Sequence, residues 1–182
     1  MKKISLFLML AVAGFAFSGC SKLADSLTVK VPVEATIELD IPAGSDLKTG
    51  GSIFYASETY NTGTDATVLE YKDRIKAIAA DGGKAKITLP SGTSITLTNT
   101  VLQVRDDDTG ALLIGWNFES KTYENNAEFT LGTPVSGSFD AFSAALDNGA
   151  NLKVELTGDS GSFSGEWTLL FTIEMTVSAG IF

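Results

Sequence analysis

Apolar and polar side chains alternate strictly along residues 27–41. Every odd-numbered residue from Leu27 to Ile41 is apolar, and the residues between them are Thr, Lys, Pro, Glu or Asp. A period of two over this length predicts a strand with one buried face. Pro32 cannot donate a ladder hydrogen bond, so we expect this strand to lie at a sheet edge and to bend or break near the proline.

A second long alternation ends the chain. The odd-numbered residues from Trp167 to Val177 are apolar, and most residues between them are Thr or Glu. Between these two strands, shorter apolar runs bounded by Gly, Pro, Asp and Ser turns predict further strands. The expected short strands are residues 52–57, 84–89, 94–104, 111–119, 127–131 and 151–157, with a polar loop at residues 58–64.

Two segments show helical periodicity instead. Residues 65–80 carry an apolar stripe that includes Ile75 and Ile78, and Gly82 would end this helix. Ser138 is placed to cap a short helix that runs through Asp147. We therefore expect a mainly β chain. The predicted fold is a single β-sandwich, Ig-like or jelly-roll-like, of about eight antiparallel strands with one medium and one short helix, spanning residues 27–182.

The first twenty residues have the three-part pattern of a secretory signal. Lys2 and Lys3 precede an apolar run at residues 4–17, and the small residues Ser18 and Gly19 follow it. The apolar run is shorter than the roughly 20 residues that a membrane span needs. The pattern predicts a signal peptide at residues 1–19 and secretion.

The sequence Phe17-Ser18-Gly19-Cys20 resembles the lipobox of bacterial lipoproteins, with Phe where Leu is commoner. The resemblance implies that Cys20 is acylated, palmitate being one such chain, and begins a tether at residues 20–26. Several acyl chains would anchor the protein stably, since each buried methylene contributes about 0.8 kcal/mol. The alternative is an ordinary signal, cleaved elsewhere, that leaves Cys20 free.

The resemblance also bears on location. Ser21 stands where an Asp would resemble an inner-membrane retention signal, and no acidic run follows Cys20. We therefore expect an outer-membrane lipoprotein that faces the periplasm, with the cell surface as the alternative. The general layout, including the segment at residues 70–78, is similar to small Bacteroidetes-type lipoproteins, and this similarity brings no assigned activity.

Charge narrows the range of partners. The net charge is −9, and loss of Lys2 and Lys3 with the signal would leave 11 basic against 22 acidic residues, a net charge of −11. Such a chain has no electrostatic attraction to phosphate backbones, so nucleic acid is not expected as a partner. The expected partners are the membrane, through Cys20, and a glycan or another envelope protein.

The absence of histidine and the single cysteine limit the chemistry. Histidine is the usual general base near neutral pH and the central member of most nucleophilic triads. One cysteine cannot form an intramolecular disulfide or a multi-cysteine zinc site. Paired carboxylates for glycoside hydrolysis are available, but nothing in the sequence singles out a pair. The chain is therefore expected to have no enzymatic activity and no cofactor.

Residues 106–108 form the densest charge cluster, Asp-Asp-Asp. Calcium prefers such oxygen ligands, which makes Asp106 and Asp108 candidate ligands. The spacing is not that of an EF-hand, because adjacent carboxylates in a tight turn point in different directions. A solvated hairpin tip is the favoured interpretation.

Aromatic residues supply the other candidate site. Trp116 and Trp167 share the register of apolar neighbours and are expected in the core. Tyr60 and Tyr123 lie in polar, loop-like surroundings, so we expect them to be exposed and to contact a sugar. They are the candidate ligand-binding residues.

Three hypotheses about function follow. The first is a lipid-anchored, non-enzymatic binding or structural component of the cell envelope. The second is a carbohydrate-binding accessory lipoprotein. The third is an adhesion or fimbrial-type subunit, in which the edge strand at residues 27–41 would accept a donor strand.

Overall fold

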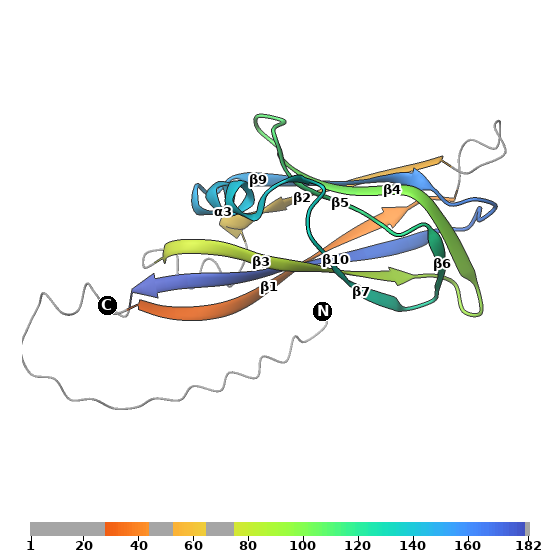
Figure 1. The fold of residues 1–182 in the computed structure, drawn as a ribbon, viewed down its shortest axis with the longest axis horizontal. Coiled ribbons are helices and arrows are strands. Elements are labelled where there is room, and N and C mark those ends of the chain that lie inside the picture. Colours follow the sequence, from red (N-terminus) through yellow and green to blue (C-terminus); the bar gives the residue numbers. More distant parts are fainter. Residues whose placement is uncertain (1–27, 44–52, 65–74, 181–182) are drawn as a thin grey trace, which may run out of the picture.

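Two antiparallel sheets packed face to face form the body of the protein (Figure 1). The computed structural model describes residues 28–43, 53–64 and 75–180. Sheet A has the order β1 (Thr28–Ile41), β10 (Trp167–Gly180), β3 (Ile75–Thr88) and β7 (Ala127–Leu131). Sheet B has the order β2 (Ile53–Asn61), β9 (Asn151–Asp159), β4 (Ser94–Asp106), β5 (Leu112–Asn117) and β8 (Ser136–Gly137), and β6 (Lys121–Glu124) pairs with β4. This architecture confirms the predicted β-sandwich.

The two long alternating segments pair with each other. β1 and β10 match over 14 residue pairs, from Thr28 opposite Gly180 to Ile41 opposite Trp167, without a register shift. β1 lies at the edge of sheet A, as predicted, but it is not broken. Pro32 is exposed and lies on this edge strand, where its missing N–H can face away from β10.

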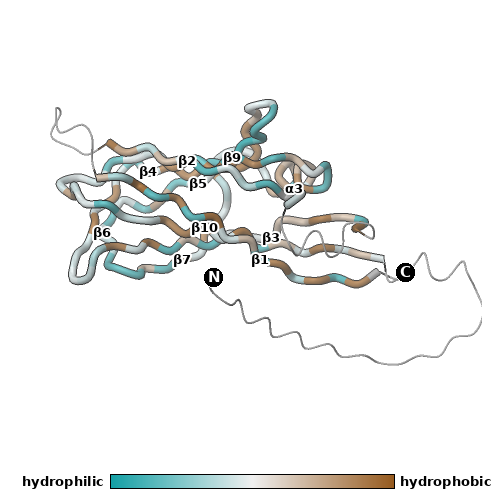
Figure 2. Tube along the Cα trace, turned by 180° about the vertical axis from the view of Figure 1, so that it is seen from behind, coloured by the Kyte–Doolittle hydropathy of each residue, from teal (hydrophilic) through white to brown (hydrophobic). Residues whose placement is uncertain are grey.

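The core lies between the sheets. Every second residue of β10 from Trp167 to Ala179 is buried, and Figure 2 shows hydrophobic positions recurring along β1 and β10. Trp116 of β5 packs against Phe171, with 5.8 Å between ring centroids, and against Phe139 at 6.2 Å. Both tryptophans are buried, which confirms their predicted place in the core.

The helix predicted at residues 65–80 is wrong from Ile75 onward, where the chain forms β3. A bulge explains the error. Ser178 pairs with Ala77 and Ala179 pairs with Ile75, so Lys76 between them is extra, and Ile75 and Ile78 lie on the same face although they are three residues apart. The interrupted alternation resembles a helical stripe. Gly82, predicted as the end of the helix, lies inside the strand, and residues 65–74 fall outside the described residues.

Several strand boundaries also differ from the prediction. β2 continues to Asn61, so the loop expected at residues 58–64 is reduced to a 3-10 turn, η2 (Thr62–Thr64). β6 and β8 were not predicted, and the described ranges hold ten strands rather than about eight. β4 bends at a bulge that includes Asn99, and its first part then pairs with β6 at one end of the sandwich (Figure 1).

The short helix is confirmed as α3 (Phe139–Asp147), and it covers an open sheet edge. Ser138 caps it by accepting the N–H of Ala141 at 3.1 Å. β7 pairs only with Gly83–Ile87, so none of the described strands pairs with the first half of β3 on that side. There the hydroxyl of Ser143 accepts the N–H of Ala80 at 2.9 Å, and Asp147 accepts the N–H of Ile78. Neither α3 nor any other helix in the described ranges is long and apolar enough to cross a membrane.

Gly137, in β8 just before α3, is a position where substitution should be costly. Its φ is +67°, and a Cβ there would lie 2.0 Å from the carbonyl oxygen of Leu113. We expect Gly137→Ala to lower the free energy of unfolding by about 3 kcal/mol in urea denaturation, because the backbone must shift or remain strained.

Gly132 offers the matched control for this measurement. It lies in the connection between β7 and β8, and its φ is not left-handed. A Cβ added there would meet no atom within 4 Å beyond its chain neighbours. Gly132→Ala should change the free energy by less than about 0.5 kcal/mol. Equal stabilities of the two variants would contradict the role assigned to Gly137.

Candidate functional site

The outer face of sheet B exposes two large apolar side chains side by side. Ile53 and Tyr55 lie two residues apart on β2, the edge strand, and are 65% and 53% exposed. Their partners across the ladder on β9 are Asp159 and Thr157. Phe54, between them, points into the core and packs edge-to-face on Trp167. An aromatic ring is therefore held on the solvent side of sheet B, beside an exposed isoleucine.

The hydroxyl of Tyr55 is anchored by a carboxylate that binds two further donors. Tyr55 donates to Oε1 of Glu155 at 2.8 Å, and Nε of Arg105 donates to Oε2 at 3.0 Å. Nζ of Lys153 lies 3.0 Å from Oε1. These donors come from β2, β4 and β9, which the register places side by side across the sheet. Glu155 is thus held from three strands, and its side chain is only 16% exposed.

Arg105 is fixed at all three of its nitrogens. Besides Glu155, it donates from Nη2 to Oε1 of Gln103 at 3.0 Å and from Nη1 to the carbonyl of Gly110 at 3.1 Å. The last bond ties the sheet face to the hairpin tip between β4 and β5. We call the set Tyr55, Gln103, Arg105, Lys153 and Glu155 the Glu155 cluster. It presents amide, guanidinium, ammonium and phenol groups in fixed positions around one exposed ring.

The protonation states of the cluster follow from these contacts. Burial acts to raise the pKa of Glu155, but the hydrogen bonds from Lys153, Tyr55 and Arg105 outweigh it and lower the pKa below the usual value. The hydrogen bond to Glu155 and the attraction of its charge raise the pKa of Lys153. The cluster therefore contains a stable carboxylate and two cations at neutral pH.

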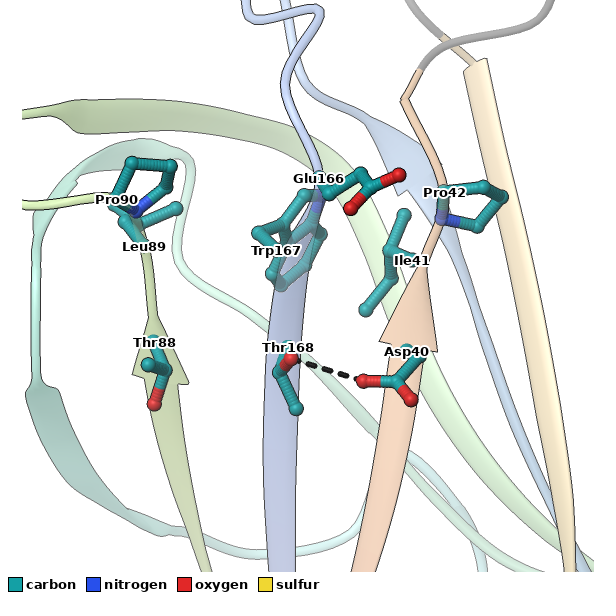
Figure 3. Close-up of a pocket in the computed structure, with 9 residues that line it drawn as sticks. All are labelled: Asp40, Ile41, Pro42, Thr88, Leu89, Pro90, Glu166, Trp167 and Thr168. Atoms are coloured by element: carbon teal, nitrogen blue, oxygen red, sulfur yellow. Dashed lines mark hydrogen bonds between the residues drawn. The ribbon is translucent and has the colours of Figure 1, made fainter.

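A groove lies at the end of sheet A, where β1, β3 and β10 meet (Figure 3). Its volume is about 570 Å³. Figure 3 shows Trp167 between Ile41 and Leu89, with Glu166 directed toward Pro42. The lining residues are Asp40, Ile41, Pro42, Thr88, Leu89, Pro90, Glu166, Trp167 and Thr168. The groove therefore combines apolar walls with two carboxylates.

The two tyrosines predicted as exposed sugar contacts are not exposed. Tyr123 is 4% exposed, lies on β6 with its ring 5.2 Å from that of Phe129, and donates its hydroxyl to the carbonyl of Glu119 at 3.0 Å. Burial raises the pKa of its phenol. Tyr60 is half-buried and packs against the core opposite Leu152. Both belong to strands that the sequence analysis treated as loops, and a strand residue can face inward.

The aspartate run forms the tip of the β4–β5 hairpin, as favoured above. Asp106 accepts the backbone N–H of Thr109 at 2.8 Å, and this bond lowers its pKa. Asp108 is exposed. Across residues 28–43, 53–64 and 75–180, no three acidic side chains gather as a metal site would require, so calcium at Asp106 and Asp108 gains no support. Cys20 lies outside the described residues.

The sequence did not reveal the Glu155 cluster. Tyr55 falls inside a predicted strand, but Ile53 and Tyr55 on one face and Phe54 and Ala56 on the other are all apolar. Alternation alone cannot decide which of two apolar faces is buried. The pairing of Lys153 with Glu155 two residues apart was the available signal, since i and i+2 share a strand face.

Comparisons with known proteins add only remote likenesses. No protein family and no curated protein matches the sequence. A decameric BFDV capsid protein is 6% identical, with a TM-score of 0.45 over 83% of this chain and 99% of that chain. The Desmodium yellow mottle tymovirus structure is 8% identical, with a TM-score of 0.35 over 95% of this chain and 98% of that chain. A structure of carbohydrate-binding modules from the β-sandwich superfamily is 12% identical, with a TM-score of 0.34 over 79% of this chain and 54% of that chain. At these identities and TM-scores the likenesses carry no inference about function.

The contacts of Glu155 generate a prediction about its titration. We expect its carboxyl to titrate below the ordinary glutamate pKa of about 4.3 when followed by NMR. In Lys153→Met the pKa should rise, because a donor and a charge are lost. Because the pKa of Glu155 is lower in the folded state than in the unfolded state, its carboxylate stabilises the fold at pH values above the unfolded-state pKa. This contribution is lost as the pH falls through the folded-state pKa.

The control is Lys121→Met, which removes the partner of Glu119 instead. It should leave the Glu155 titration unchanged. If Lys121→Met moved the Glu155 pKa as much as Lys153→Met, the contact with Lys153 could not be the cause.

Proposed function

We propose that this protein is a lipid-anchored, non-enzymatic binding module of the cell envelope that binds glycans on the outer face of sheet B. The observation that carries the proposal is the half-exposed ring of Tyr55, anchored through its hydroxyl in the Glu155 cluster. This site replaces the one predicted at Tyr60 and Tyr123.

The chemistry of the cluster suits a sugar. One face of a pyranose is apolar and packs on an aromatic ring, while its hydroxyls bond to polar side chains nearby. Arg105, Gln103 and Lys153 supply donors and an acceptor within the same cluster. Because Tyr55 and Arg105 are already held by hydrogen bonds, binding would immobilise few additional side-chain rotamers.

The chemistry of the cluster also argues against catalysis. A glycoside hydrolase needs two carboxyl groups across the scissile bond, one of them protonated. Glu155 is the one carboxylate of the cluster, it accepts three donors, and its pKa is lowered rather than raised. The sequence has no histidine to take over acid–base chemistry.

The anchor is proposed from the sequence. The small residues Ser18 and Gly19 before Cys20 are typical of a lipobox, and the chain has no other cysteine. We propose acylation of Cys20 and attachment to the outer membrane, with the domain facing the periplasm. The membrane would then keep the glycan-binding face close to envelope polysaccharides.

A second candidate function is favoured by one observation. β1 is the edge strand of sheet A and is paired on one side only among the described strands. An adhesion or fimbrial-type subunit could accept a donor strand on such an edge. Pro32 interrupts that edge because it has no N–H to donate, so we rank this function below glycan binding.

Glycan binding can be tested with the purified domain on a glycan array. We expect binding of at least one glycan class, and a loss of at least about tenfold in affinity for Tyr55→Ala, because the stacking surface is removed. Tyr55→Phe should retain part of the affinity, since it keeps the ring.

Val135→Ala is the control for this experiment. Val135 is 59% exposed beside β8, at the opposite edge of the same sheet. Its substitution should leave the affinity unchanged. Absence of binding to any glycan, or binding that survives Tyr55→Ala, would contradict the proposed site.

Acylation is tested separately in the native host. Wild type should incorporate labelled palmitate and partition into the detergent phase, whereas Cys20→Ser should do neither, since the thiol that carries the lipid is gone. Ser21→Ala is the control and should remain acylated. Membrane retention of Cys20→Ser equal to that of wild type would refute the lipid anchor.

A further inference from the structure

The groove at the end of sheet A holds two carboxylates without a cationic partner in the described part of the chain. The ion pairs formed between described residues involve other acids, which are Glu34, Glu119, Glu155 and Glu174. Oδ1 of Asp40 accepts the hydroxyl of Thr168 at 3.0 Å, and Glu166 is exposed. In a chain with a net charge of −9, two such carboxylates attract cations and repel anions.

The other lining residues of the groove are Thr88, Thr168 and five apolar residues. Trp167 and Leu89 are buried side by side at its base, and Pro42 and Pro90 stand on either side (Figure 3). The indole of Trp167 is fixed by an edge-to-face contact with Phe54, with 5.2 Å between centroids at 85°. A volume of about 570 Å³ suits a ligand with a short chain.

We propose that this groove binds a guanidinium group carried on an aliphatic stem. The stem lies against Pro42 and Pro90, and the cation reaches Asp40 and Glu166. Guanidinium is more weakly hydrated than ammonium and forms planar pairs with carboxylates, so it loses less on leaving water. A sugar fits less well, because Trp167 presents almost no exposed ring face. The site is separate from the Glu155 cluster and does not depend on glycan binding.

The test is an NMR titration of the unmodified domain with n-butylguanidinium, and with n-butanol as the neutral analogue. The two tryptophans provide an internal comparison. Trp167 lines the groove, whereas the indole N–H of Trp116 donates to the carbonyl of Gly132. We expect a saturable shift of the Trp167 indole signal with butylguanidinium alone. Equal shifts of both indole signals, or an equal response to butanol, would overturn the proposal.

Isosteric variants separate charge from shape. The double variant Asp40→Asn plus Glu166→Gln keeps the acceptor for Thr168 and should weaken binding about fivefold or more. Glu38→Gln removes an exposed acid of the same strand, outside the groove, and should change affinity less than twofold. Binding should also weaken from about 20 mM to about 500 mM salt. Unchanged affinity in the double variant would overturn the assignment.

A peptide identifies the source of the guanidinium. Capped Gly-Arg-Gly carries the same group on a backbone. Tighter binding of the peptide than of butylguanidinium supports an arginine of a partner protein, and weaker binding supports a free guanidinium compound. Binding of neither overturns the proposal, and neither result affects the Tyr55 experiment.

Discussion

Burial of one face of β10 is the constraint on which the rest of the structure depends. This strand pairs with β1 on one side and β3 on the other, and its alternate residues from Trp167 to Ala179 form the floor of the core. Burial of apolar surface contributes about 25 cal/mol per Å², so the continuous buried face of this strand stabilises the fold along its whole length. The register of β10 determines where the bulges of β3 lie and places Trp167 beside the groove. It also puts the threonine and glutamate side chains of β10 on the outer face of sheet A.

The edges of the sheets show how the fold completes this arrangement. α3 supplies side-chain acceptors to the first half of β3 on the side that β7 does not reach. β6 closes one end by pairing with the bent start of β4 before the chain crosses to β7. β1 differs, since none of the described strands or helices covers its open side, and Pro32 and a row of exposed acids protect it instead. The edge strands β1 and β2 lie next to the two candidate binding sites.

Charge is distributed unevenly between those sites. On sheet B the cations Arg105 and Lys153 surround Glu155, so that face can offer donors to hydroxyl groups in spite of the acidic chain. At the end of sheet A, Asp40 and Glu166 have no such partners among the described residues. One domain thus presents a balanced polar face around Tyr55 and a negatively charged groove beside Trp167. This difference is why different ligands are proposed for them.

The sequence by itself determined the sandwich, the two long strands β1 and β10, the edge position of β1, the short helix and the buried tryptophans. These features depend on local periodicity, capping and Pro32, which act over neighbouring residues. Only the tertiary structure decided that residues 75–80 form a strand, in which a bulge opposite β10 produces the helix-like spacing. It decided, too, that Tyr123 is buried. It also decided the candidate sites. Strand pairing across long stretches of sequence brings Tyr55 and Arg105 into contact with Glu155, and it places Asp40 and Glu166 on one groove. No local pattern records either arrangement.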